Sequence, residues 1–134
     1  MFNYKRSELS EYELTTMKCI WDAGEPVTCQ EIMDMLRKDY GLDYQDTTVY
    51  TYLKKLKQKG FINSYRRGVI FFEAVRSEEE YRNEQLQKVT DLWFKGSRKN
   101  MIAGIFEAGP FSPEEKEEIK KEIDKWYKEQ GGSA

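Results

Sequence analysis

The stretch between Asp46 and Glu73 concentrates the side chains that could do chemistry. It carries six cationic residues, whereas Asp46 is the only acidic residue before Glu73. Because so few carboxylates lie nearby in the sequence, the cations lack local partners for ion pairs, and a polyanion is the expected ligand. The six cations are Lys54, Lys55, Lys57, Lys59, Arg66 and Arg67.

Threonine and tyrosine side chains accompany these cations. Apolar residues recur at helical spacing in the first part of the stretch and predict one buried helix face, formed by Val49, Tyr52, Leu53 and Leu56. The polar front of such a helix has the size and chemistry to enter the major groove of DNA. The residues expected to bind DNA, in this helix and in the turn of the hairpin that follows, are Thr47, Thr48, Tyr50, Thr51, Lys54, Lys55, Arg66 and Arg67.

Within this set, we expect the threonines and Tyr50 to contact base edges or flanking phosphates, and the lysines and arginines to neutralise phosphate. Two other interpretations stay open. A lysine-rich helix is often only a solvated face, and the same cations could meet an acidic protein partner instead of DNA. The cationic hairpin tip beside the helix favours a binding role over a solvated face.

Other chemistries lack their residues. The 134 residues include no histidine and two cysteines, Cys19 and Cys29, whose spacing matches no zinc pattern. Neither a nucleophile with a neighbouring base nor a metal-activated water can be assembled, so we expect no catalytic residue, no metal and no cofactor. Cys29 follows a helix cap at Thr28, where a helix N-terminus could favour a thiolate. Thiol sensing is therefore a hypothesis beside the commoner role of a small buried residue.

Capping patterns mark where several helices begin. Two capping boxes, Ser10-Glu11-Tyr12-Glu13 and Thr28-Cys29-Gln30-Glu31, precede apolar-periodic segments, and Ser77-Glu78-Glu79-Glu80 repeats the pattern. Ser112-Pro113 places proline at the first helical position of the last segment. Two β-rich runs, 61–65 and 69–73, flank a tight Arg66-Arg67-Gly68 turn and predict a hairpin.

The order is therefore three helices, a two-stranded wing and three further helices. The second and third helices are joined by the short link 42–45, which is the organisation of a helix-turn-helix. We expect a mainly α fold with a small β-wing: a winged helix-turn-helix DNA-binding domain over residues 1–76 and a helical dimerisation region over residues 77–134.

The predicted C-terminal helices have narrow apolar faces and no strand to pack on. A second copy of the chain is the expected partner, with folding back onto the N-terminal module as the alternative. Eight acidic residues face five lysines after Gly104, so the tail is anionic and the net charge is −2 although the middle is cationic. The expected dimer contacts are Leu92, Trp93, Met101, Ile105, Phe106, Ile119, Ile123 and Trp126.

No apolar run approaches the roughly 18 residues that span a bilayer, and no apolar block of a signal peptide follows Met1. We expect a cytoplasmic protein with double-stranded DNA and a second copy of itself as partners, and no membrane contact.

Three blocks in this order resemble the penicillinase-repressor family of bacterial winged-helix repressors. They are the segment Leu9 to Leu14 with Met17 and Ile20-Trp21, the segment Thr47 to Thr51 with Leu53, Leu56 and Lys59-Gly60, and the segment Asp91 to Phe94 with Asn100-Met101. The resemblance covers nearly the whole chain. It implies a homodimer on a pseudo-palindromic operator that blocks transcription.

Two features of relatives are missing from this chain. Copper-responsive members carry a cysteine cluster near the C-terminus, whereas no cysteine follows Cys29 here. Members that respond to β-lactams are cleaved at an Asn-Phe bond in the tail, and Gly104-Ile105 occupies the matching place. The resemblance therefore implies repression without indicating the inducing signal, sensor or protease.

Overall fold

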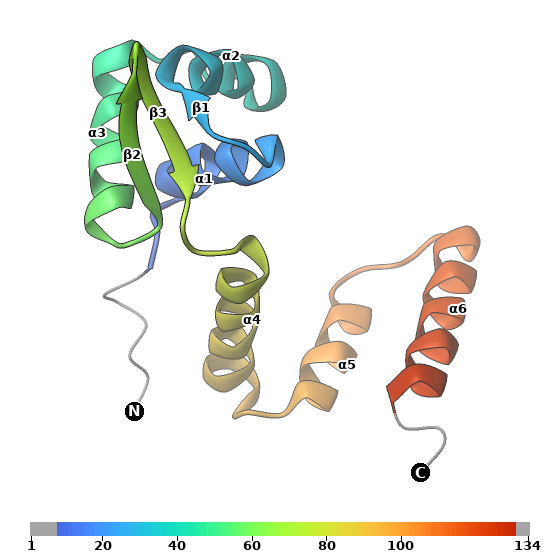
Figure 1. The fold of residues 1–134 in the computed structure, drawn as a ribbon. Coiled ribbons are helices and arrows are strands. Elements are labelled where there is room, and N and C mark those ends of the chain that lie inside the picture. Colours follow the sequence, from blue (N-terminus) through green and yellow to red (C-terminus); the bar gives the residue numbers. More distant parts are fainter. Residues whose placement is uncertain (1–7, 131–134) are drawn as a thin grey trace. The chain divides into compact units, whose positions relative to one another are not determined.

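The computed structural model describes residues 8–130, which form six helices and three short strands (Figure 1). Two compact units divide the chain, residues 1–88 and residues 89–134, with the boundary inside α4. The elements are α1 (Glu11–Ala23), β1 (Val27–Thr28), α2 (Cys29–Tyr40), α3 (Asp46–Gln58), β2 (Ile62–Arg67), β3 (Val69–Ala74), α4 (Glu78–Phe94), α5 (Arg98–Ala108) and α6 (Pro113–Gln130).

The expected capping boxes form at the starts of α1 and α2. The Ser10 and Thr28 hydroxyls accept hydrogen bonds from the backbone N–H groups of Glu13 and Glu31, and each glutamate side chain accepts one from the backbone of its cap. Gly41 ends α2 with φ +66°, a left-handed conformation that suits glycine, and its N–H donates to the Arg37 carbonyl. The predicted starts of both helices are confirmed.

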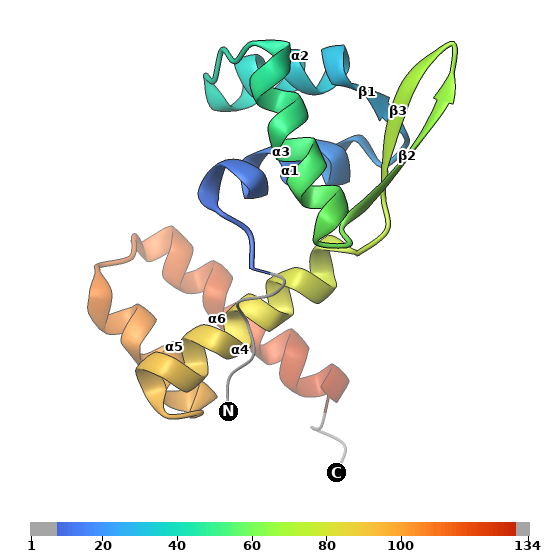
Figure 2. The ribbon, with the colours of Figure 1, turned by 90° about the vertical axis from the view of Figure 1, so that its left-hand side faces the viewer.

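The sheet has three antiparallel strands in the order β1-β3-β2. β2 and β3 form the expected hairpin, which extends beside α3 (Figure 2). The expectation of a two-stranded wing was incomplete, because the two residues of β1 also pair with β3 through Val27 opposite Phe72. This pairing ties the start of α2 to the base of the wing.

The first unit is built around one apolar core to which its helices and strands contribute. Side chains from α1, α2 and α3 meet those at the base of the wing, and the large residue Phe61 between α3 and β2 is fully buried. The most deeply buried apolar residues are Met17, Ile20, Ile32, Leu36, Val49, Leu53, Leu56, Phe61 and Ile62.

The first turns of α4 belong to this unit. The backbone N–H of Leu9 donates to the Tyr81 hydroxyl at 2.8 Å, and the Trp21 indole N–H donates to the Arg76 carbonyl at 2.8 Å. The Arg76 guanidinium lies 5.0 Å from the ring centre of Phe61 and 5.4 Å from that of Tyr81, within cation–π range. The chain leaving β3 is thus fastened to both ends of α1.

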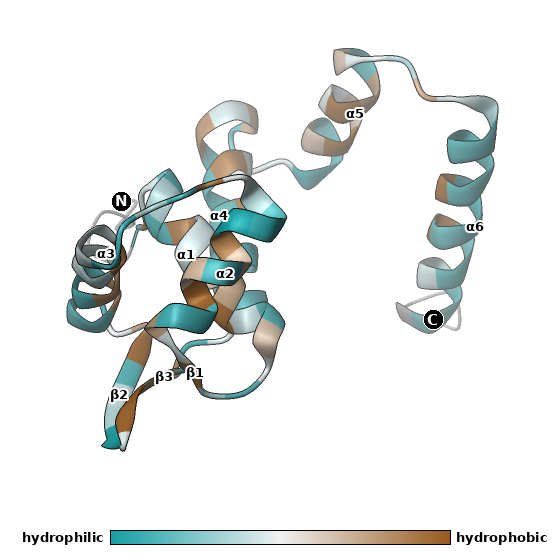
Figure 3. Ribbon diagram, turned by 90° about the horizontal axis from the view of Figure 1, so that it is seen from above, coloured by the Kyte–Doolittle hydropathy of each residue, from teal (hydrophilic) through white to brown (hydrophobic). Residues whose placement is uncertain are grey.

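The second unit buries much less. α5 has no buried residue, and hydrophobic segments interrupt the mostly hydrophilic ribbon of α6 (Figure 3). Phe106 and Phe111 meet edge to face at 5.4 Å, and a Cβ added to Gly104 would lie 2.8 Å from the Phe94 ring, so only glycine admits that close approach. Among residues 8–130, no helix is both long and apolar enough to cross a membrane.

Candidate nucleic-acid interface

α3 has the two faces that its sequence pattern predicts. Val49, Leu53 and Leu56 are fully buried against the core. Tyr52, which was expected on the same face, is only partly buried. The residues that point away from the core are the expected DNA-binding ones: Thr48 is partly buried, whereas Thr47, Tyr50, Thr51, Lys54 and Lys55 are exposed.

Local hydrogen bonds define the polar face of α3. The Asp46 carboxylate accepts from the N–H of Thr47 at 2.7 Å, where an anion also suits the positive end of the helix dipole. The Thr51 hydroxyl donates to the Thr47 carbonyl at 3.0 Å. The hydroxyl proton of Thr51 is therefore engaged within the helix, which leaves its methyl group and oxygen lone pairs for an external partner.

One flank of α3 lies against the base of the wing. The Tyr50 ring meets Phe72 of β3 edge to face at 6.1 Å, although 42% of Tyr50 stays exposed. Lys57 donates to the Ser64 hydroxyl of β2 at 2.9 Å. These contacts bring the predicted helix and wing residues together on one part of the first unit.

Burial also governs the two cysteines beside this region. It raises the pKa of the Cys29 thiol, against a smaller lowering by a hydrogen bond with the Tyr50 hydroxyl. Burial raises the pKa of Cys19 to about 11. The start of α2 thus does not stabilise a Cys29 thiolate, contrary to the condition that thiol sensing requires.

The other flank of α3 carries residues that sequence reasoning misassigned. Lys59 was grouped with the cations available to a polyanion, but its ammonium group donates to the Glu13 carboxylate at 2.6 Å and to the Glu8 carbonyl at 2.8 Å. Burial alone would raise the pKa of Glu13. The hydrogen bonds from Lys59 and from the backbone of Ser10 outweigh it, so the pKa lies below its ordinary value. Lys59 therefore serves the structure of the first unit.

The wing tip presents two arginines. Arg66 and Arg67 were expected in the turn, but they are the last residues of β2, paired with Ile70 and Val69. Gly68 alone makes the reversal, with φ +75°, which is accessible to glycine at little cost. Both arginines are exposed, and Arg66 donates only to the Gly68 carbonyl, at 3.3 Å.

Ion pairing separates this surface from the rest of the first unit. Lys18, Lys59, Arg37, Arg76 and Lys88 each pair with a carboxylate. In the part of the chain that the structure describes, none of the cations on the front of α3 or at the wing tip does so; these are Lys54, Lys55, Arg66 and Arg67.

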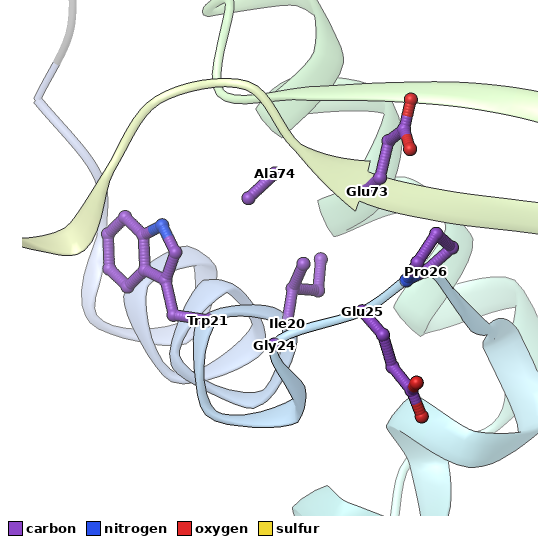
Figure 4. A pocket seen from close by; sticks show the side chains of 7 residues that line it. All are labelled: Ile20, Trp21, Gly24, Glu25, Pro26, Glu73 and Ala74. Atoms are coloured by element: carbon purple, nitrogen blue, oxygen red, sulfur yellow. The ribbon is translucent and has the colours of Figure 1, made fainter.

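A separate hollow of about 270 Å³ lies between the end of α1, the connector to β1 and the end of β3. Ile20 and Trp21 form its apolar wall, and Glu25 and Glu73 lie at its rim (Figure 4). The two carboxylates point away from one another in that view, so they do not converge on a shared ligand position. None of the expected DNA-binding residues lines this hollow.

The expected dimer contacts lie on the second unit and are mostly unburied. Six of them are exposed, with Trp93 at 78% and Trp126 at 60%. Met101 and Ile119 are partly buried. The exposed ones are Leu92, Trp93, Ile105, Phe106, Ile123 and Trp126.

A helix-turn-helix whose third helix is followed by a β-hairpin, with unpaired cations on both, defines the class of winged-helix DNA-binding proteins. The family model described as penicillinase repressor matches residues 9–125, and the chain belongs to that family of repressors.

Comparison with solved structures found a similarity to the monomeric form of Bacillus licheniformis BlaI, determined in solution in complex with the blaP half-operator. The two chains are 28% identical with a TM-score of 0.46, and the match covers 55% of this chain and 88% of that one. Comparison with curated protein sequences found no match.

Proposed function

We propose that this protein is a transcriptional repressor that binds a pseudo-palindromic DNA operator as a homodimer. One observation carries the proposal: the exposed front of α3 and the wing tip hold cations that no carboxylate of residues 8–130 neutralises. Phosphates would satisfy them and release counterions from the duplex. Membership of the penicillinase repressor family supports the same function.

In this proposal α3 enters the major groove. Thr47, Thr48, Tyr50 and Thr51 contact base edges or the phosphates beside them, and Lys54 and Lys55 neutralise phosphate. Arg66 and Arg67 reach the sugar-phosphate backbone from the wing. The phosphate contacts supply affinity and register, and the base contacts supply the choice of sequence.

The second unit supplies the dimer contacts in this proposal. Residues 1–76 bind DNA, and residues 77–134 join two copies. The exposed Trp93, Trp126 and Phe106 support it, because aromatic side chains left in water on one copy are strong anchors for an interface. A symmetric dimer then requires an operator with matching two-fold symmetry.

A gel shift with mixed-sequence DNA at low salt tests the proposal at its base. Binding that weakens steeply as salt rises is expected from phosphate contacts. A protein that ignores DNA under these conditions but binds an acidic polypeptide would instead be a winged-helix interaction module. A footprint that protects one asymmetric half-site would contradict the homodimer.

Substitution of Lys54 tests the assigned face. Lys54→Ala should weaken binding to all sequences and lower the slope of log K against log salt by about 1, because one phosphate contact is lost. Lys38→Ala is the matched control, since Lys38 is exposed on α2 and outside the proposed surface. Equal affinities and slopes for Lys54→Ala and the wild type would show that the face is wrongly assigned.

A further inference from the structure

Three tyrosines from three different segments meet on the side of α3 away from the wing. Tyr12 comes from the first turn of α1, Tyr44 from the α2–α3 link and Tyr52 from α3. The Tyr12 and Tyr52 rings stack at 6.1 Å with an interplanar angle of 18°, and Tyr44 meets Tyr12 and Tyr52 edge-on at 6.2 Å and 5.8 Å. We call these three residues the tyrosine cluster.

The position of Tyr52 on α3 places this cluster beside the proposed DNA-binding face. Tyr52 follows Thr48 by four residues and precedes Lys55 by three, so the three side chains neighbour one another along the helix. The opposite flank carries Tyr50 and Lys57, which contact the wing. A helix in the major groove has a phosphate backbone on each side, and the cluster stands on the side that the wing does not reach.

The hydroxyl groups of the cluster are used unequally. Burial and then the neighbouring phenols raise the pKa of Tyr44, whose hydroxyl is hydrogen bonded with that of Tyr52. Tyr12 is 49% exposed, and within residues 8–130 its hydroxyl has no hydrogen-bond partner. One phenolic O–H is therefore available on a side chain whose ring is already held in place by stacking, which reduces the entropy lost on binding.

We infer that the tyrosine cluster extends the DNA interface onto α1, with the Tyr12 hydroxyl donating a hydrogen bond to a backbone phosphate on the side opposite the wing. This inference rests on the proposed function and adds a contact to it. Tyr44 and Tyr52 act as positioning residues, because their rings hold Tyr12 against α3.

Charge makes this contact different from those of the lysines and arginines. Glu13 is neutralised by Lys59, whereas Glu11 is exposed and close enough to contribute to the raised pKa of Tyr44. The cluster therefore offers no net positive charge and fits phosphate through a neutral donor. Such a contact adds affinity without displacing a further counterion, so it leaves the salt slope unchanged.

The test compares full-length Tyr12→Phe protein with the wild type on a palindromic duplex that the wild type selects from a random-sequence pool. Tyr12→Phe keeps the stacked ring and removes only the hydroxyl. Binding should weaken roughly tenfold, as for the loss of a hydrogen bond to a charged group, with the salt slope unchanged. Ethylation of one phosphate in each half-site should impair wild-type binding but no longer affect the variant.

Tyr127→Phe is the matched control, because Tyr127 is an exposed tyrosine on α6, in the second unit. It should bind as the wild type does. Equal affinity of Tyr12→Phe and wild type, or an identical ethylation pattern, would overturn the inference while leaving the proposed function standing. Failure of the wild type to bind any duplex would overturn both.

Discussion

The two units of this chain treat their large apolar side chains in opposite ways. In the first unit Phe61, Leu53 and Leu56 are almost fully excluded from solvent. In the second unit Trp93 and Trp126 are exposed by 78% and 60%, and neither α5 nor Ile123 of α6 contributes a buried apolar side chain. Both units are helical and both contain aromatic residues, so composition does not explain the difference.

The difference lies in what each unit can pack against. Three helices and a sheet enclose a common interior in the first unit, whereas α5 and α6 have narrow apolar stripes and no sheet. A single copy of the second unit therefore leaves apolar area in water, which costs about 25 cal/mol per Å². This contrast supports the view that the first unit folds on its own contacts and the second is completed by another copy.

Phe61→Ala should have the largest effect on this contrast. Removing a fully buried ring from the first unit is expected to lower the free energy of unfolding by about 3–5 kcal/mol, measured by urea denaturation with circular dichroism. Phe106→Ala in the second unit removes the same side chain from a position that is 46% exposed and should have a smaller effect on that transition. Equal losses for the two variants would abolish the distinction between the units.

Trp126→Ala should act on assembly. If Trp126 anchors the proposed dimer, its removal should weaken dimerisation by about 2 kcal/mol or more, measured by sedimentation equilibrium, while the unfolding of the first unit stays unchanged. Lys125→Ala is the control, because Lys125 is the exposed neighbour on α6. A dimer constant unaffected by Trp126→Ala would remove this residue from the interface.

Glu13→Gln tests a polar contact inside the first unit. Losing the charged hydrogen bond with Lys59 should cost about 2 kcal/mol at neutral pH. Because the pKa of Glu13 is lowered on folding, its carboxylate stabilises the protein above the ordinary value of 4.5, and that contribution is lost as pH falls through the lower folded value. The stability difference between wild type and variant should therefore shrink below about pH 4.5.

Glu11→Gln is the control for that measurement, since Glu11 lies in the same turn and is exposed. It should change stability by less than about 0.5 kcal/mol. A difference between wild type and Glu13→Gln that does not vary between pH 7 and pH 3 would show that the Glu13 carboxylate does not carry the effect.

Local signals made much of this fold predictable. The Ser10 and Thr28 capping boxes, the glycine after Tyr40 and Pro113 at the start of α6 each act over a few residues, and the structure confirms the element boundaries that they indicate. The wing was predictable because alternating β-rich runs flank Gly68. β1 was not, because two residues show no periodicity and its pairing with Phe72 depends on the tertiary fold.

The same limit applies to the candidate site. The periodicity of α3 separated Leu53 from Lys54, but it could not show that Lys59 is paired with Glu13, 46 residues earlier in the chain. Nor could it bring Tyr12 next to Tyr52. A cation count over a sequence window includes every lysine alike, whereas burial and ion pairing decide which of them can meet a ligand.

The buried cysteines have a practical consequence. With a pKa of about 11, Cys19 exists as a thiolate in only about one molecule in ten thousand at pH 7, and Cys29 is shifted in the same direction. Maleimide and iodoacetamide reagents should therefore react slowly with the native thiols. A single cysteine introduced on the surface could then carry a fluorophore or spin label without removal of either natural one.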